Sequence, residues 1–107
     1  FTGTSEIEHE NSLVHWKLWP YDEPERTWQR SPMAHAKRSK TATLVVHGLA
    51  DTRVPPGQAK ELFRALRHAG TTTELVLYPR EGHGLSERAH QIDFSTRFVE
   101  WFERHVK

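Results

Sequence analysis

The chain has 107 residues, enough for one small domain, and 15 Lys and Arg oppose 14 Asp and Glu for a net charge of +1. This near-balance excludes strong non-specific attraction to nucleic acid or to anionic lipid. The chain has no Cys, which excludes disulfides and cysteine nucleophiles and fits a reducing compartment, so we expect a cytoplasmic protein. No apolar run approaches the roughly 18 residues that a membrane-spanning helix needs.

The first forty residues are expected to form an arm of irregular and helical structure. Their polar sequence, studded with aromatic residues, shows no sustained hydrophobic period. A short helix is predicted within residues 5–19. A second is predicted over residues 24–30, because Pro24 lies near its start and Ser31-Pro32 follows its end.

A strand and a helix are predicted after the arm. Thr41–His47 is a short, β-branched apolar run that ends at Gly48, which is typical of a buried strand. A helix is expected to begin near Pro56, since proline is tolerated in the first helical turn, and Gly70 is suited to a left-handed C-cap. The apolar residues between them follow the helical spacing: Ala59, Leu62, Phe63, Leu66 and Ala69.

A second strand and a second helix complete this regular part. Thr71–Tyr78 is predicted to be a strand that Pro79 ends, and Ser86 is a suitable N-cap for the last helix. The apolar side chains of that helix are expected to form one buried stripe: Phe94, Phe98, Trp101, Phe102 and Val106.

These elements predict an α/β fold in which residues 41–107 run strand, helix, strand, helix and residues 1–40 form the arm. Strands joined by a helical crossover run parallel, and a parallel sheet needs cover on both faces. Because a sheet of two strands is marginal on its own, we expect it to be completed by oligomerisation, as a homodimer or a higher homo-oligomer.

Each predicted strand is followed by a loop that carries an ionisable side chain. Asp51 lies four residues after His47, and His83 lies five residues after Tyr78. Ligands of open α/β sheets bind beyond the carboxyl ends of the strands, and adjacent strands are about 4.8 Å apart. Asp51 and His83 are therefore expected within hydrogen-bond reach. An Asp that accepts from one imidazole nitrogen leaves the other free to act as a general base.

The two loops resemble those of a known fold family. His47–Pro55 (His-Gly-Leu-Ala-Asp-Thr-Arg-Val-Pro) is similar to the acid loop of α/β-hydrolases, and Tyr78–Leu85 (Tyr-Pro-Arg-Glu-Gly-His-Gly-Leu) to their histidine loop. Together with Glu23–Arg26 and Ser31-Pro32, they make the chain similar to the C-terminal catalytic domain of the prolyl oligopeptidase family, in particular its acylaminoacyl-peptidase-like branch. The fold that this implies is a partial α/β-hydrolase domain.

The resemblance also implies a serine hydrolase in which Asp51 is the orienting acid and His83 the general base. The nucleophile of the family lies on a Gly-x-Ser-x-Gly motif, which this sequence lacks; Gly3–Ile7 contains only its first half. We therefore expect a chain related to ester or peptide hydrolases, with weak or altered activity on small ester or peptide substrates when it is separate. This leading hypothesis needs no cofactor.

Two alternatives stay open at this point. His47, Asp51 and His83 offer nitrogen and oxygen ligands for Zn²⁺ or Mn²⁺, which would make the chain a metal-dependent hydrolase of phosphate or carboxylic esters. The second alternative is a non-catalytic fragment that associates with further copies through its free sheet edge and its Trp-rich arm. The other His residues are expected to be solvated or partly buried: His9, His15, His35, His68, His90 and His105.

Overall fold

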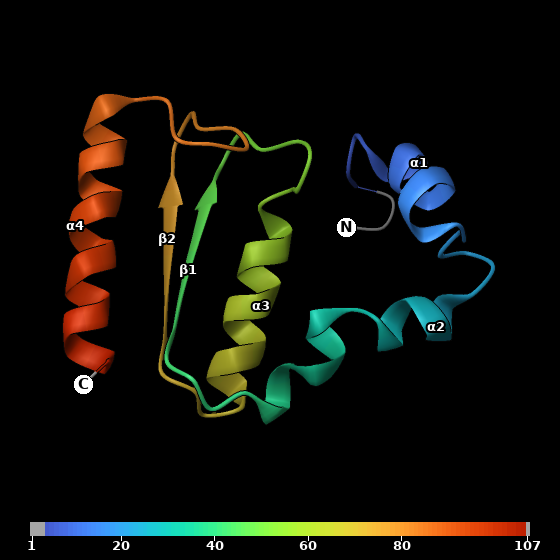
Figure 1. The fold of residues 1–107 in the computed structure, drawn as a ribbon, viewed down its shortest axis with the longest axis horizontal. Helices are drawn as coiled ribbons and strands as arrows, with labels where there is room; N and C mark the ends of the chain where they lie inside the picture. Colours follow the sequence, from blue (N-terminus) through green and yellow to red (C-terminus); the bar gives the residue numbers. More distant parts are fainter. Residues whose placement is uncertain (1–3, 107) are drawn as a thin grey trace.

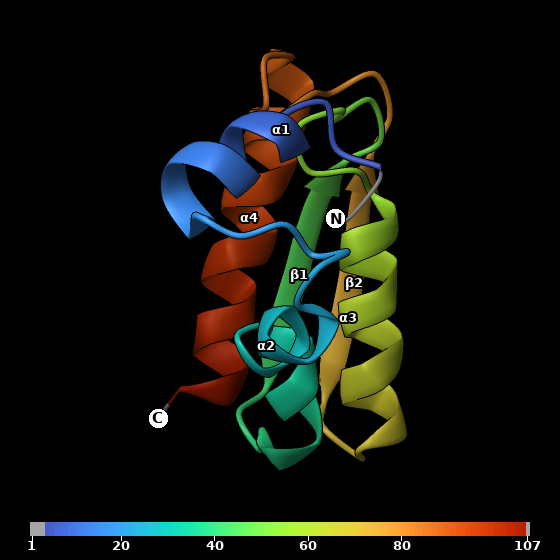
Figure 2. The same cartoon turned by 90° about the vertical axis from the view of Figure 1, so that its right-hand side faces the viewer.

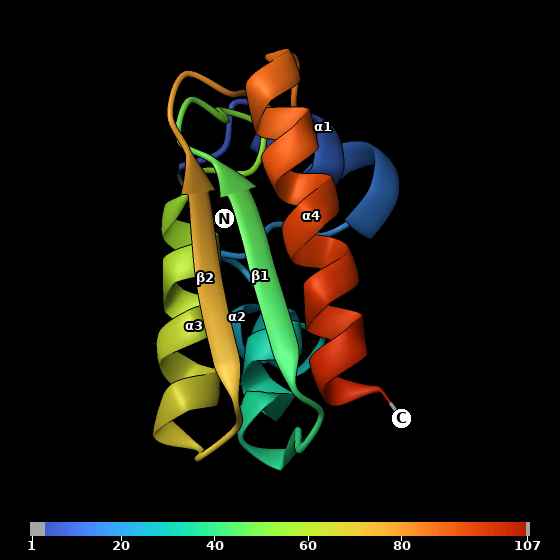
Figure 3. The ribbon, with the colours of Figure 1, turned by 90° about the vertical axis from the view of Figure 1, so that its left-hand side faces the viewer.

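The structure, a computed structural model, describes residues 4–106 and has three layers. A two-stranded sheet lies between helix α3 on one face and helix α4 on the other (Figure 1, Figure 3). The arm lies on the same side of the sheet as α3 (Figure 1), and seen from that side it lies next to α3 and in front of β1 (Figure 2). The elements of the regular part are β1 (Thr43–Gly48), α3 (Gly57–His68), β2 (Thr73–Tyr78) and α4 (Arg88–His105).

The sheet is parallel, as predicted, and its register runs from Thr43 opposite Thr73 to Gly48 opposite Tyr78. Both strands begin two residues later than the sequence pattern suggests. Thr71 still belongs to the turn that caps the end of α3, because its backbone N–H donates to the Leu66 carbonyl at 3.0 Å. The carboxyl ends of both strands point to the same edge of the molecule, where the two loops lie (Figure 1).

Helix α3 begins and ends close to where the sequence predicts. Pro56 is its N-cap residue, and Ala59 and Leu66 are buried on the face that packs on the sheet. Gly70 has a φ of 82°, so the predicted left-handed C-cap is confirmed. The N–H groups of Gly70 and Thr71 bond to the carbonyls of Arg67 and Leu66, which is the pairing of a Schellman motif.

Two predictions for helix α4 are wrong, one about its N-cap and one about its buried side chains. The N-cap residue is Glu87 and not Ser86, whose hydroxyl donates instead to Glu81 at 2.8 Å. The expected buried stripe is mostly exposed: Trp101 is 5% exposed, whereas Phe98 and Phe102 are 47% and 46% exposed, and Val106 lies beyond the helix at 63%. The physical reason is width, because two strands cannot cover the apolar face of an 18-residue helix.

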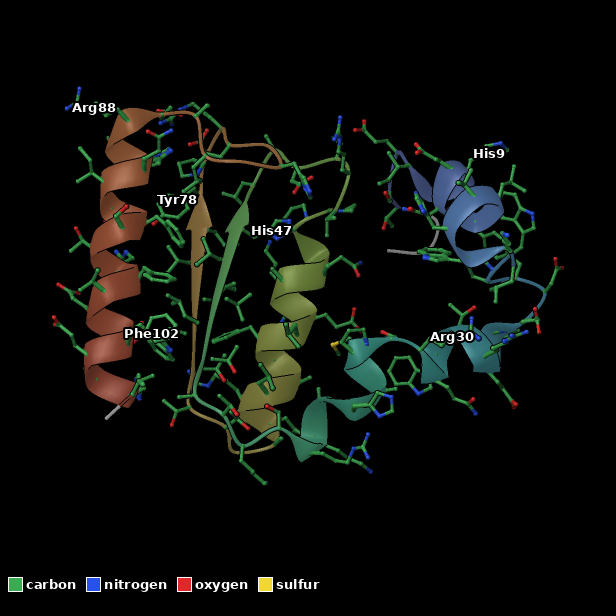
Figure 4. All side chains as sticks on the ribbon, viewed as in Figure 1. His9, Arg30, His47, Tyr78, Arg88 and Phe102 are labelled. Carbon is green, nitrogen blue, oxygen red and sulfur yellow. The ribbon has the colours of Figure 1, made fainter. Side chains whose placement is uncertain are left out.

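Tyr78 attaches the first half of α4 to the sheet. Its side chain points from the end of β2 toward α4 (Figure 4), and its hydroxyl donates to Asp93 Oδ2 at 2.8 Å. Burial of the phenol, followed by this bond to a carboxylate, raises the pKa of Tyr78 to about 12. The ring of His90 lies 5.1 Å from the Tyr78 ring, so α4 is held by polar and aromatic contacts at the end nearest the loops.

The arm contains the two short helices predicted for it and one that was not predicted. A turn of α-helix continues into a π-helical segment, and the 3₁₀ segment after Ser31 is capped because the Ser31 hydroxyl accepts from the Met33 N–H at 3.3 Å. In chain order these elements are α1 (Glu8–Glu10), η1 (Asn11–Trp16), α2 (Pro24–Gln29) and η2 (Pro32–Arg38). In the part of the chain that the structure describes, no helix has the length and apolar character needed to cross a membrane.

Candidate active site

Asp51 is held by the turn that follows β1. Its side chain is 4% exposed, and its Oδ1 accepts from the backbone N–H groups of Arg53 and Val54 at 3.0 and 2.9 Å. This is the local bonding that makes Asp common in turns. It fixes the carboxylate plane and leaves Oδ2 as the oxygen directed at the neighbouring loop.

His83 approaches that second oxygen from the loop after β2. Its Nδ1 lies 2.9 Å from Asp51 Oδ2, so the predicted contact between the two side chains is present. Because an ionised carboxylate only accepts, the shared proton belongs to Nδ1, and Nε2 of the neutral ring carries a lone pair. The His83 side chain is 58% exposed, which leaves Nε2 accessible to a reactant.

Several contacts set the ionisation of Asp51. Its burial on its own raises the pKa, but the hydrogen bonds from Val54 and His83 and the charges of His83 and His47 outweigh that effect. The pKa of Asp51 is therefore below its usual value, and the group is an anion at neutral pH. An anion at this position both orients the imidazole and stabilises its protonated form.

The two loops are in direct contact, and Gly48 makes this possible. A Cβ on Gly48 would lie 2.3 Å from the Gly82 carbonyl oxygen and 2.4 Å from that of Glu81, so only glycine fits. The Ala50 N–H donates to the Glu81 carbonyl at 2.8 Å, one residue before Asp51. The backbone itself thus sets the spacing of Asp51 and His83.

His47 lies at the end of β1 on the side of α3 (Figure 4), where its Nε2 is 3.4 Å from Asp51 Oδ2. The same nitrogen is 2.6 Å from the Val54 carbonyl oxygen, to which it donates, so it carries a proton and cannot ligate a metal ion in that state. The metal site of His47, Asp51 and His83 stays a prediction. Within residues 4–106, the set of His, Asp and Glu side chains spaced for an ion is a different one: Glu81, Glu87 and His90.

Glu81 is a residue at the site for which the sequence pattern predicted no role. It is fully buried, and its carboxylate accepts from the Ser86 and Glu87 N–H groups, the Ser86 hydroxyl and His90 Nδ1 at 2.8–3.1 Å. Burial opposes ionisation, but the bonds from Ser86, Glu87 and His90 lower the pKa of Glu81 to about 2. A Glu in a loop with Gly, Arg and Ser has the sequence of a solvated residue, so no local pattern marks it.

This pKa predicts how stability depends on pH. The usual pKa of Glu is 4.5 and that of folded Glu81 about 2, so the ionised group stabilises the fold above pH 4.5. That contribution should be lost as the pH falls from 4.5 toward 2. In urea unfolding at a series of pH values, the wild type should lose stability across this range more steeply than Glu81→Gln. Parallel curves for the two proteins would contradict the assignment.

The arm also reaches the acid loop. The Glu6 N–H donates to the Thr52 carbonyl at 3.0 Å, and the Ser5 hydroxyl donates to the carbonyl of Arg53. Ser5 Oγ in turn accepts from the Ile7 N–H at 3.2 Å. Ser5, the serine in the half motif noted above, is thus 9% exposed and already bonded to the backbone, which is a structural role.

Two known proteins are similar to this chain in sequence. The uncharacterized peptidase YuxL of Bacillus subtilis is 34% identical over 111 residues, which cover 99% of this chain and 17% of YuxL. The acylamino-acid-releasing enzyme of Homo sapiens is 35% identical over 77 residues, covering 72% of this chain and 10% of that enzyme. The chain therefore spans less than a fifth of the length of either relative.

Solved structures agree with the sequence relatives. The acylaminoacyl peptidase of Pyrococcus horikoshii superposes with a TM-score of 0.81 at 28% identity, over 99% of this chain and 18% of that protein. A protein from Klebsiella pneumoniae named "Putative Dienelactone Hydrolase" superposes with a TM-score of 0.61 at 25% identity, over 67% of this chain and 33% of that protein. The fold is thus that of part of an α/β-hydrolase. The sequence profile described as the prolyl oligopeptidase family matches residues 3–107, and the chain belongs to this family of hydrolases.

Proposed function

We propose that the chain provides the acid and the base of a hydrolase site for carboxylic esters or peptides, with Asp51 as the orienting acid and His83 as the general base. The observation that carries the proposal is the 2.9 Å contact from Asp51 Oδ2 to His83 Nδ1, with the Asp51 carboxylate buried and the His83 ring exposed. Membership of a hydrolase family supports the choice of reaction.

The chemistry follows from the two ring nitrogens. His83 Nε2 removes a proton from an attacking hydroxyl or water, whose oxygen forms a bond to the carbonyl carbon. The imidazolium is stabilised by Asp51 and then returns the proton to the leaving oxygen or nitrogen as its bond to carbon breaks. The sequence holds no Gly-x-Ser-x-Gly motif, so in the isolated chain the attacking group is water, and we expect slow turnover of activated esters.

Hydrolysis of p-nitrophenyl acetate tests the proposal. His83→Ala should hydrolyse the ester more slowly than the wild type, because the oriented Nε2 is gone. His68→Ala is the matched control, since His68 is exposed and ends α3 at the opposite end of the sheet from the two loops (Figure 1). Equal rates for the wild type and His83→Ala would refute the proposal.

The metal-dependent alternative is tested on the same assay. Treatment with EDTA followed by addition of Zn²⁺ or Mn²⁺ should leave the rate unchanged if His83 acts as proposed. A rate that falls with EDTA and returns with the metal ion would favour the alternative site instead.

Self-association also stays a prediction. Among the described residues, β1 pairs only with β2, and α4 exposes the apolar side chains of Ile92, Phe98, Val99 and Phe102. A sheet edge and an apolar helix face of this kind are suited to association. Sedimentation should then show a mass that rises with protein concentration, whereas a monomer at high concentration would contradict the prediction.

A further inference from the structure

Glu81 joins three parts of the molecule at the candidate site. Its carbonyl accepts from Ala50 in the acid loop, and its carboxylate accepts from Ser86, Glu87 and His90 at the start of α4. It lies two residues before His83 in the chain. One residue therefore connects the loop of Asp51, the loop of His83 and the first turn of α4.

The bonding of this cluster excludes its use as a metal site in the state observed. Glu81, Glu87 and His90 have the spacing for an ion, but both Glu81 oxygens are occupied by N–H and O–H donors. His90 Nδ1 donates to Glu81 Oε2 at 3.0 Å and so carries a proton, which leaves it no lone pair for a metal. The cluster is a structural anchor in which hydrogen bonds stabilise the negative charge of Glu81.

The loop beyond Glu81 needs such an anchor. Gly82 and Gly84 flank His83, and the segment between Glu81 and Ser86 has no regular secondary structure. Glycine loses more conformational freedom on ordering than other residues, so the orientation of the His83 ring depends on how the ends of this loop are fixed. Glu81 is one end of this loop and Ser86 is the other. The Glu81 carboxylate joins the two ends, because it accepts from both the N–H and the hydroxyl of Ser86.

We propose that Glu81 is a positioning residue for His83: its buried carboxylate closes the loop from Glu81 to Ser86 and thereby holds His83 Nδ1 against Asp51. The inference rests on the proposed function for its effect on rate, but its effect on the His83 ring is independent of catalysis. A displacement of about 1 Å at a reacting group is enough to lower a rate on the order of 10²-fold.

The test is Glu81→Gln, which keeps the shape and removes the charge. Whichever way the amide turns, its NH₂ faces the backbone N–H of Ser86, which lies 3.1 Å from Oε1 and 3.0 Å from Oε2 and cannot become an acceptor. We expect ester hydrolysis to fall on the order of 10- to 100-fold. In ¹⁵N NMR at neutral pH, the His83 ring should shift from the form protonated at Nδ1 toward the form protonated at Nε2.

Glu103→Gln is the matched control. It makes the same chemical change on an exposed side chain near the C-terminal end of α4, away from the cluster around Glu81. The rate and the His83 ring signals of Glu103→Gln should equal those of the wild type.

The outcomes separate the two proposals. A folded Glu81→Gln with wild-type rate and wild-type His83 ring signals overturns the positioning role. A change in the ring signals of Glu81→Gln, combined with no loss of rate in His83→Ala, supports positioning and refutes the hydrolase proposal. If Glu81→Gln does not fold, Ser86→Ala removes a single donor at 2.8 Å and should shift the ring signals in the same direction by less. Unchanged signals in Ser86→Ala would then overturn the role.

Discussion

Replacing Asp51 by Asn should lower the rate of ester hydrolysis by about 10²- to 10⁴-fold with little effect on folding. The backbone N–H groups of Arg53 and Val54 need an acceptor, so the Asn oxygen should keep the position of Oδ1. The Asn NH₂ then takes the place of Oδ2 and donates to His83 Nδ1. This reverses the bond and moves the ring proton to Nε2, where the base is needed.

Asp22→Asn provides the control for this change. Asp22 is exposed in the arm, and the same substitution there should leave the rate unchanged. Rates are best compared with free energies of unfolding measured on the same samples, because Asp51→Asn is expected to lose activity while it keeps its fold at neutral pH. An Asp51→Asn protein with the wild-type rate would show that Asp51 does not orient the base.

Among the glycines that the structure describes, Gly48 is expected to be the one at which alanine destabilises the fold most. The new Cβ would meet the carbonyl oxygens of Gly82 and Glu81 at 2.3 and 2.4 Å, and both are backbone atoms that cannot rotate away. The loops must separate and strain the bond from Ala50 to Glu81. Overpacking together with this bond should lower the free energy of unfolding by about 2–4 kcal/mol, as measured by urea denaturation.

The matched control for Gly48→Ala is Gly57→Ala. Gly57 is the first residue of α3, and a Cβ there would have nothing within 4 Å. Alanine favours the helix over glycine by about 0.5–1 kcal/mol, so this variant should be slightly more stable than the wild type. A Gly48→Ala protein as stable as Gly57→Ala would mean that the two loops are not packed as described.

The sequence predicts best those elements that depend on residues near one another in the chain. Gly70 ends α3 because a left-handed residue is needed there, and the apolar period of α3 matches its buried side. The meeting of Asp51 and His83 followed from topology, because parallel strands end at the same edge. Neither inference needed knowledge of the tertiary packing.

The features that sequence could not predict depend on what surrounds a residue in space. The exposure of Phe98 and Phe102 depends on the number of strands beneath α4, which the period of a helix does not encode. Glu81 is buried because Ser86 and His90 close over it, and a charged loop residue has no local signal for that. Ser86 was expected to cap α4, and its hydroxyl serves this buried carboxylate instead.

The state of the His83 ring tests the central claim most directly. Long-range ¹H–¹⁵N NMR of the wild-type chain at neutral to mildly basic pH distinguishes a protonated from an unprotonated ring nitrogen. Because Nδ1 is hydrogen-bonded to Asp51 Oδ2, we expect Nδ1 to carry the proton and Nε2 to be unprotonated. In Asp51→Asn, we expect Nε2 to carry the proton and Nδ1 to be unprotonated. A His83 ring protonated at Nε2 in the wild type, with signals that Asp51→Asn leaves unchanged, would contradict the account.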